Sequence, residues 1–543
     1  MERMIRRLKG SLLPIILLAL VGYPAKSQTR SVSKPKLVVF ITIDAMRADY
    51  LPRFEKQLTG GLARLYRGGA VFTNGFQDHA ITETAPGHSA TMSGRFPVHT
   101  GIMTNIAGVN DSTVSLVDAV GLGASPFRFR GTTLTDWLIA KDSRTRVLSV
   151  SRKDRAAILP IGRSKQQVFW YASNGNFTTS TYYSTSLPEW VRAFNARKIP
   201  ASYAGRAWRL LLPASAYSEP DSVPVESDGV GFTFPHYESG TPDSATRFLS
   251  EFPWMDDITL DFALAGVKAL QLGAGPQTDM LAISLSTTDA VGHRYGPDSR
   301  ELHDQILRVD RGLGAFLDSL FRMRNRNDVV IALTADHGLT PFPEVHAHDP
   351  NGGAIRVDVQ PVLAQLSTSL AAAGVPGKGL TNTFGVYRGN GFLFDSGVLE
   401  LDKAALARAN VNKDSLVQSV RAAFLQVPGV ARAERISELA RRDTVNDGIA
   451  RRWLHIFSNE DQAALVVSLA PYNYWLAGYW QAQHGSPNDP DVRVPIIFYG
   501  RDVMPGRYTE FARVVDMAPT LAAIVGVTPQ EKIDGHVLQH AIR

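Results

Sequence analysis

The sequence predicts an α/β sandwich with a largely parallel central sheet and inserted cap subdomains. Three observations lead to this prediction: continuous apolar segments of strand length, amphipathic helical patterns between them, and polar residues directly after several apolar segments. Continuous apolar character is typical of strands buried on both faces of a parallel sheet. Strands that alternate with helices indicate an α/β fold, and such folds bind ligands at the carboxyl ends of their strands.

The expected strands are short, rich in β-branched residues and bounded by polar side chains. They cover residues 36–44, 146–151, 279–289, 328–338 and 493–500. Two clear helical patterns, with apolar residues three and four positions apart, cover residues 304–323 and 516–526.

Residues 1–27 have the layout of a secretory signal peptide: a basic start, an apolar run and small residues at Ala25 and Ser27. The alternative, a membrane anchor, is less favoured because the apolar run is short for a bilayer span. Cleavage after Ser27 would leave no stable membrane span and a periplasmic or secreted protein.

The mature chain divides by composition into core and inserted regions. Residues 166–258 are rich in Tyr, Trp, Ser and Pro and read as an inserted cap, whereas residues 376–460 read as a small α+β insertion. The core then comprises residues 28–165, 259–375 and 461–543.

The composition excludes several classes of function. Among 543 residues, 44% are hydrophobic and 20% charged, which is ordinary for a globular protein, and there is no cysteine. Disulfides and thiolate metal sites are therefore excluded, so a metal would need His, Asp, Glu or hydroxyl ligands. Outside the first 27 residues there is no run of Lys and Arg that would indicate a nucleic-acid partner.

Six His and Asp side chains lie beside the ends of the predicted strands. Taken singly, each has an ordinary alternative as a helix cap, turn residue or surface pair. Taken together, they favour a two-metal site, for which zinc suits mixed His/Asp ligation best, although manganese and iron also accept it. The six residues are Asp44, Asp289, His293, Asp336, His337 and His484.

Such a site needs a nucleophile and positive charge for a phosphoryl group. The segment "HAITETAPGHSA" offers three hydroxyls, Thr82, Thr84 and Ser89, which spacing cannot separate. Because Pro86 suits a first helical turn, Thr84 is expected near a helix N-cap, either as a plain cap or as a nucleophile beside free N–H groups. Lys153 and Arg155 in "SRKDRAAI" form either a phosphate clamp or a solvated basic turn.

Several segments together resemble the alkaline phosphatase superfamily. More closely, they resemble bacterial monomeric alkaline phosphatases with a threonine nucleophile and a Lys-x-Arg phosphate clamp, and more distantly nucleotide pyrophosphatase/phosphodiesterases. The segments that carry the resemblance, in order, are "ITIDAMRADYL", "TETAPGHSATMSGRFPVHTGI", "SRKDRAAILPIG", "STTDAVGHRYGP", "LTADHG" and "HGSPNDPDVRVPIIF".

The resemblance implies an alkaline-phosphatase-like sandwich with two Zn²⁺ ions per chain. It assigns one ion to Asp44, Asp336, His337 and the oxygen of Thr84, and the other to Asp289, His293 and His484. Thr84 takes the position of the nucleophile, and Lys153 and Arg155 take the clamp. Asn105 takes the position of an amide that binds a phosphate oxygen, although the residue that follows it is Ile106, where the family often has an aromatic residue.

The implied activity is hydrolysis of a broad range of small-molecule phosphate monoesters through a phosphothreonine intermediate, by a monomer. Two alternatives remain: a phosphodiesterase or nucleotide pyrophosphatase on the same core, and a non-catalytic periplasmic zinc- or phosphate-binding protein. The pair His346 and His348 is left either as a further metal site or as part of a surface loop.

Overall fold

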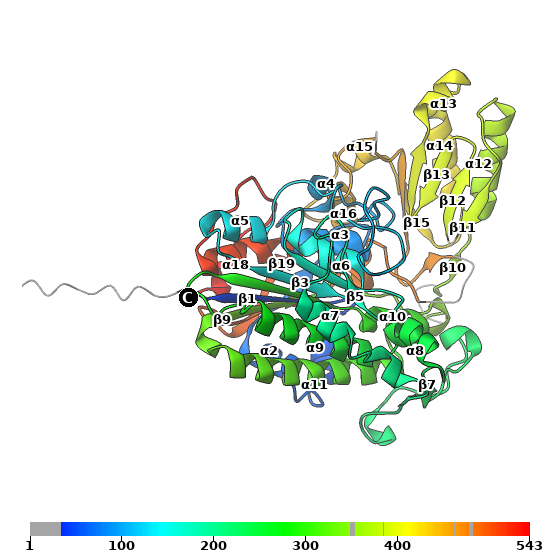
Figure 1. The fold of residues 1–543 in the computed structure, drawn as a ribbon. Helices are drawn as coiled ribbons and strands as arrows, with labels where there is room; N and C mark the ends of the chain where they lie inside the picture. Colours follow the sequence, from blue (N-terminus) through cyan, green and yellow to red (C-terminus); the bar gives the residue numbers. More distant parts are fainter. Residues whose placement is uncertain (1–33, 348–352, 384, 461, 477–481) are drawn as a thin grey trace, which may run out of the picture. The chain divides into compact units, whose positions relative to one another are not determined.

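A nine-stranded sheet forms the centre of the molecule (Figure 1). The computed structural model describes residues 34–543 except 348–352, 384, 461 and 477–481. The predicted signal peptide therefore lies outside the described residues. The strand order across the sheet is β19-β2-β18-β9-β1-β8-β3-β4-β5.

The middle of this sheet is parallel, as the sequence predicts. β1 (Leu37–Ile43) pairs in parallel with β8 (Asp279–Leu285) and β9 (Val329–Thr334), and β8 pairs in parallel with β3 (Val147–Ser151). Every residue of these four strands is buried, which explains their continuous apolar sequences.

The last predicted strand, β18 (Ile496–Gly500), runs in the opposite direction to its neighbours. It pairs antiparallel with both β9 and β2 (Ala70–Phe76), while β19 (Gly506–Arg513) pairs in parallel with β2. Because β18 is reversed, the segment before it lies at the same edge of the sheet as the ends of β1, β8 and β9.

Helices cover both faces of the sheet, which completes the predicted sandwich (Figure 1). One face carries α2 (Gly61–Gly68), α9 (Trp254–Ala269) and α11 (Arg300–Met323). The other face carries α3 (Thr84–Thr91), α5 (Leu134–Lys141), α6 (Asp154–Ile158) and α18 (Met517–Val525). Both predicted helices, now α11 and α18, are confirmed.

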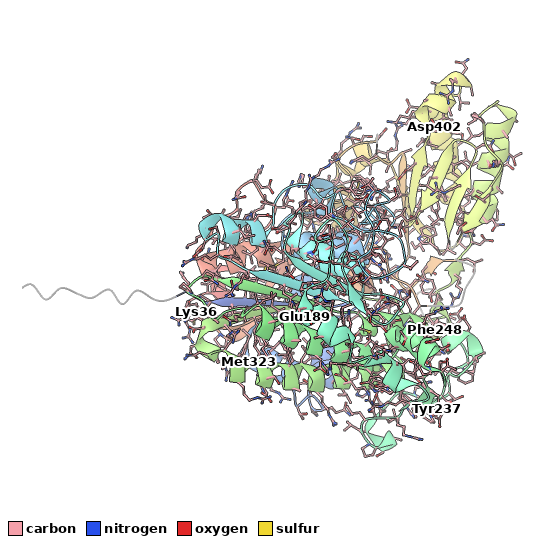
Figure 2. All side chains as sticks on the ribbon, in the orientation of Figure 1. Lys36, Glu189, Tyr237, Phe248, Met323 and Asp402 are labelled. Carbon is pink, nitrogen blue, oxygen red and sulfur yellow. The ribbon has the colours of Figure 1, made fainter. Side chains whose placement is uncertain are left out.

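The region predicted as a cap begins later than residue 166. β4 (Gln167–Tyr171) and β5 (Phe177–Thr178) extend the central sheet beyond β3, because the apolar run "QVFWY" is buried there as a strand. The rest of the region holds short elements, and its Tyr237 and Phe248 are exposed (Figure 2). These elements are α7 (Glu189–Asn195), β6 (Ala207–Trp208), β7 (His236–Tyr237) and α8 (Pro242–Phe248).

The region of the predicted α+β insertion contains a separate six-stranded sheet with its own apolar core, and the elements of this unit extend beyond residues 376–460 on both sides. α12 (Gln360–Ala372) and β16 (Leu465–Leu469) belong to it, because their apolar side chains pack into its core. Asp402 caps one of its helices (Figure 2). Its other elements are β11 (Thr381–Thr383), β12 (Val386–Gly389), β13 (Phe392–Asp395), β14 (Val398–Leu401), α13 (Lys403–Arg408), α14 (Lys413–Phe424) and β15 (Val430–Glu434).

Short elements complete the described part of the chain, in which no helix is long and apolar enough to cross a membrane. They are α1 (Tyr50–Phe54), α4 (Pro97–Thr100), α10 (Thr287–Tyr295), β10 (Arg356–Val357), α15 (Ile436–Leu439), α16 (Gly448–Leu454), β17 (Tyr474–Trp475) and α17 (Asp489–Val492).

Candidate active site

Three of the predicted ligands meet at the carboxyl ends of two neighbouring strands. Asp44 follows β1, and Asp336 and His337 follow β9; their ligand atoms lie within 4.8 Å of one another. We call these three residues the inner group, since each is 0% exposed. Asp336 and His337 lie beyond the last strand residue, so the turn brings both side chains into one group. The backbone directly after Asp44 is strained, because Ala45 adopts a positive φ of 59°.

The other three predicted ligands form a second group, which we call the outer group. Asp289 and His293 lie one turn apart on α10, with Asp289 Oδ1 3.2 Å from His293 Nε2. His484, from the loop before α17, places its Nε2 3.7 Å from Asp289 Oδ1. The rings of His484 and His337 stack with centroids 3.7 Å apart, so the two groups are contiguous.

All three histidines are oriented by the backbone in the same way. Each places Nδ1 beside a carbonyl oxygen: His337 at 2.8 Å from Gly338, His293 at 2.6 Å from Ala482, and His484 at 2.7 Å from Thr82. A carbonyl can only accept, so Nδ1 carries the hydrogen and Nε2 presents a lone pair. This is the arrangement that typically orients an imidazole as a metal ligand.

The buried acceptors of both groups lack ordinary partners. Asp44 Oδ1, Asp289 Oδ1 and His337 Nε2 are buried without a hydrogen bond among the described residues. Leaving such atoms unpaired is costly, and a divalent cation would satisfy them. The residues therefore fit two metal ions, and His and Asp donors suit zinc.

The pKa values of Asp44 and Asp289 are shifted in opposite directions. Burial raises the pKa of Asp44 to about 6, and repulsion from the carboxylates of Asp289 and Asp336 adds to the shift. Burial also opposes ionisation of Asp289, yet the cations of Lys153 and His293 hold its pKa well below the usual value. Asp44 therefore takes up a proton at a higher pH than Asp289 does.

Only one of the three candidate hydroxyls points to the positive charge of the site. Thr84 Oγ1 lies 3.3 Å from Lys153 Nζ. The Thr82 hydroxyl instead donates to the Ser486 carbonyl at 2.9 Å, and the Ser89 hydroxyl donates to the Pro86 carbonyl at 2.8 Å. The structure therefore separates hydroxyls that spacing could not.

The helix that carries Thr84 begins one residue earlier than expected from a cap at that position. Glu83, with extended φ and ψ of −112° and 164°, is the N-cap residue, and Thr84 is the first residue of α3. The helix lies close against the inner group, because a Cβ on Gly87 would come within 2.1 Å of the Asp336 carbonyl oxygen. Gly87 is thus required for this close approach.

Lys153 lies between the two groups. Its Nζ is 2.6 Å from Asp44 Oδ2 and 2.6 Å from Asp289 Oδ2. Arg155 has a different backbone setting: Lys153 is the extended N-cap residue of α6, whereas Arg155 lies within that helix. The Nε of Arg155 is buried and makes no hydrogen bond to a described residue.

Asn105 is held against the start of α3. Its Oδ1 accepts a hydrogen bond from the Ala85 backbone N–H at 2.8 Å, and its own backbone N–H donates to Glu83 Oε2 at 2.6 Å. Asn105 and His484 both line a cavity of about 270 Å³ between the core and the insertion.

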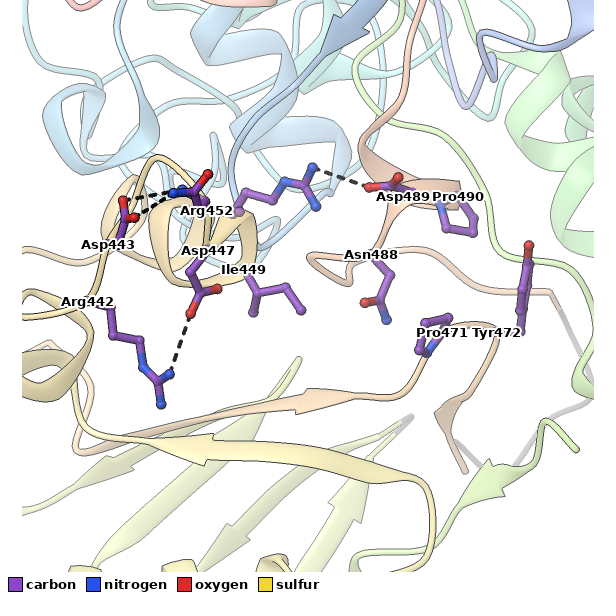
Figure 3. Close-up of a pocket in the computed structure, with 12 residues that line it drawn as sticks. Arg442, Asp443, Asp447, Ile449, Arg452, Pro471, Tyr472, Asn488, Asp489 and Pro490 are labelled. Atoms are coloured by element: carbon purple, nitrogen blue, oxygen red, sulfur yellow. Dashed lines mark hydrogen bonds and ion pairs between the residues drawn. The ribbon is translucent and has the colours of Figure 1, made fainter. Parts of the chain in front are cut away.

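A separate cavity of about 800 Å³ lies around α16 (Figure 3). Arg442, Asp447 and Arg452 are among its lining residues, and the described residues that line it include none of the predicted site residues. It is therefore not part of the candidate active site.

Two residues of the same segment were not predicted as site residues. His88, one helical turn after Thr84, places Nδ1 3.1 Å from Asp336 Oδ2, and Glu83 contacts Asn105. The spacing of four residues between Thr84 and His88 is a sequence signal that could have identified His88 as a site residue. Of the other histidines, His346 stacks on Tyr472 with centroids 4.3 Å apart, and His348 lies outside the described residues.

The fold defines the class of protein. The crystal structure of alkaline phosphatase PafA is similar to this chain with a TM-score of 0.83 and 27% identity, over 94% of this chain and 99% of that one. The predicted alkaline-phosphatase-like fold is thereby confirmed.

Comparisons of sequence define the family. The model for type I phosphodiesterases and nucleotide pyrophosphatases matches residues 38–359. Alkaline phosphatase PhoV of Synechococcus elongatus is 32% identical over 95% of this chain and 94% of its own length. Alkaline phosphatase PhoK of a Sphingomonas species is 32% identical over 93% and 91%. The chain belongs to the type I phosphodiesterase/nucleotide pyrophosphatase family.

Proposed function

We propose that this chain hydrolyses phosphate monoesters of broad range at a two-metal site, with Thr84 as the nucleophile and a phosphothreonine intermediate. The enzyme class is a phosphoric monoester hydrolase, as expected from full-length relatives named alkaline phosphatases. One observation supports the two-metal site and the role of Thr84. Three imidazole Nε2 atoms and unpaired carboxylate oxygens lie in two adjoining groups, and Lys153 between these groups contacts Thr84.

In this proposal the inner group and Thr84 would hold one Zn²⁺ ion, and the outer group would hold the other. Two such cations supply Lewis-acid stabilisation for the attacking and leaving oxygens of phosphoryl transfer. The donor set supports zinc, because the ligands are imidazole nitrogens and carboxylate oxygens at buried positions.

The protein residues position the phosphoryl group. Thr84 Oγ1 forms a bond to phosphorus as the bond to the alcohol oxygen breaks, and the proton that Thr84 loses is balanced by the proton that the departing alcohol gains. Water then cleaves the phosphothreonine, which releases phosphate and restores the hydroxyl. Lys153, within 3.3 Å of Thr84 Oγ1, would meet the equatorial oxygens as a point charge, and Asn105 would donate its amide N–H groups to them. Arg155 would complete the clamp through its unpartnered guanidinium nitrogen.

The family also contains phosphodiesterases, so the nearest competing proposal is diester hydrolysis at the same site. The buried ammonium of Lys153 favours monoesters, because a monoester carries a second negative charge that a diester lacks.

Location in the periplasm or outside the cell is proposed from the predicted signal peptide. Neither this location nor the proposed monomeric state depends on the proposed reaction.

The test compares p-nitrophenyl phosphate with bis-p-nitrophenyl phosphate, each with and without EDTA, together with metal analysis of the purified protein. We expect two zinc ions per chain and faster monoester hydrolysis that EDTA abolishes. Preferred hydrolysis of the diester would contradict the proposal and support the alternative.

A further inference from the structure

The insertion reaches the segment that carries the nucleophile. Ala80 and Ile81, just before Glu83, pack in one apolar cluster with Val398 and Trp453 of the region 376–460. The same region also lines the cavity beside His484 and Asn105. The insertion is thus attached to the core at the residues that lead into α3.

A polar contact continues this attachment. The turn between β13 and β14 consists of Ser396 and Gly397, with positive φ values of 48° and 81°. Two positive φ values are typical of a tight two-residue hairpin turn. The Ser396 hydroxyl lies 3.0 Å from Glu83 Oε1 and 3.0 Å from Asp395 Oδ1.

Glu83 also contacts Asn105, so it connects the Ser396 turn to that residue. Glu83 Oε2 accepts the Asn105 backbone N–H at 2.6 Å, and Asn105 Oδ1 in turn accepts the Ala85 N–H at 2.8 Å. With Oδ1 occupied by the start of α3, the amide N–H groups of Asn105 are the part of the side chain left for a phosphate. Asn105 is thus hydrogen-bonded to Glu83 and to Ala85, the two residues that flank Thr84. These bonds fix Asn105 relative to Thr84.

We propose that Glu83 is a positioning residue that holds Asn105 for phosphate, and that the Ser396 turn of the insertion holds Glu83. The inference rests on the proposed function, in that it takes Asn105 to bind the phosphoryl group. It gives the insertion a role in the reaction although the insertion supplies no metal ligand from its described residues.

The test is a double-mutant cycle between Glu83→Gln and Asn105→Ala. The glutamine introduced by the first substitution would offer one acceptor oxygen to the two donors and turn an NH₂ group toward the other. Because Glu83 acts through the Asn105 side chain, Glu83→Gln should lower kcat/KM for p-nitrophenyl phosphate about 10-fold in the wild-type background and less than about 2-fold in the Asn105→Ala background. Binding of inorganic phosphate to the zinc-loaded protein, measured by calorimetry, should weaken in the same pattern.

Variants of the turn test the second half of the proposal. Ser396→Gly removes the hydroxyl and suits the positive φ, and should lower kcat/KM about 3-fold with no further loss when combined with Glu83→Gln. Ser396→Asn tolerates the same backbone and restores a donor, so it should return most of the activity. The control is Asn410→Gly, a second positive-φ residue of the insertion, at φ 53° after α13, which should leave kcat/KM unchanged.

Equal losses in both backgrounds, or no loss in either, would overturn the proposal. Thermal unfolding of each variant separates positioning from folding, and loss of the fold in both Glu83→Gln and Ser396→Gly would assign the pair a purely structural role. If the wild-type protein neither hydrolyses the monoester nor binds phosphate, the proposed function fails; if it does both and the cycle is additive, only the present inference fails.

Discussion

The inner and outer groups offer similar ligands in different surroundings. The inner group comes from the ends of adjacent parallel strands and is 0% exposed. The outer group comes from one helix and one loop, and its His293 and His484 side chains are 23% and 10% exposed. In the proposed two-metal site, one cation position is therefore enclosed in the core and the other is more open to solvent.

The largest expected effect concerns Thr84, whose Oγ1 lies 3.3 Å from Nζ of Lys153, the residue between the two groups. Thr84→Ala should lower turnover of p-nitrophenyl phosphate by about 10⁴-fold or more, because it removes the proposed nucleophile. Metal analysis should still find zinc, since six ligands remain. Thr84→Ser, which keeps a hydroxyl, serves as the matched variant and should retain more activity. Full activity in Thr84→Ala would exclude the nucleophile assignment.

Substitution of a histidine in the inner group should lower the free energy of unfolding more than substitution of a histidine in the outer group. His337→Ala and His293→Ala should each lower activity about 10³-fold. His337→Ala should also cost about 2–4 kcal/mol in free energy of unfolding, because it leaves a cavity beside buried carboxylates. His293→Ala should cost less than about 1 kcal/mol, since its side chain is partly exposed. Denaturant unfolding of both variants checks this, and equal costs would remove the distinction.

The clamp residues should differ in size of effect. Lys153→Ala should lower monoester kcat/KM about 100-fold, because Lys153 is buried between the two groups, whereas Arg155→Ala should lower it about 10-fold. Diester hydrolysis should change less in both variants. Equal losses for monoester and diester would indicate that the clamp does not recognise the second negative charge.

Acid should weaken the outer group before the inner group. Metals bind deprotonated ligands, so affinity falls as pH falls through each ligand's pKa. Burial opposes the charged form of His293, but Asp289 raises its pKa above the usual value, whereas burial raises the pKa of Asp44 only to about 6. His293 therefore gains its proton before Asp44 does on acidification.

Zinc content at a buffered free-zinc concentration measures this order. Between about pH 7.5 and 5.5 the wild-type protein should lose one ion several-fold more readily than the other. The His293→Ala variant should keep only the ion that is lost last. Simultaneous loss of both ions would show that the two groups titrate together.

Much of the fold and of the inner group could be predicted because apolar runs and their terminal polar residues report strand ends directly. Asp44, Asp336 and His337 each follow a buried strand within three residues. The boundaries of the insertion could not be predicted in this way, since the apolar run of β16 does not reveal which sheet it joins. The contact between Glu83 and Ser396 spans 313 positions and leaves no local pattern.

The geometry of the clamp shows a second limit. Spacing by two predicts a shared direction only in extended chain, and α6 begins directly after Lys153. A helix of five residues is too short to show a period of 3.6, so no pattern in this segment indicates that Arg155 lies in a helix.

The absent side chain of Gly87 has a consequence for the range of substrates. With α3 seated on the Asp336 carbonyl, main chain rests against main chain, and such a contact can neither stretch nor repack as side chains do. In the proposed mechanism, this contact holds Thr84 at the same place relative to the strand ends whichever ester is bound. Under that mechanism, departing alcohols of different size would be accommodated in the cavity that His484 and residues of the insertion line.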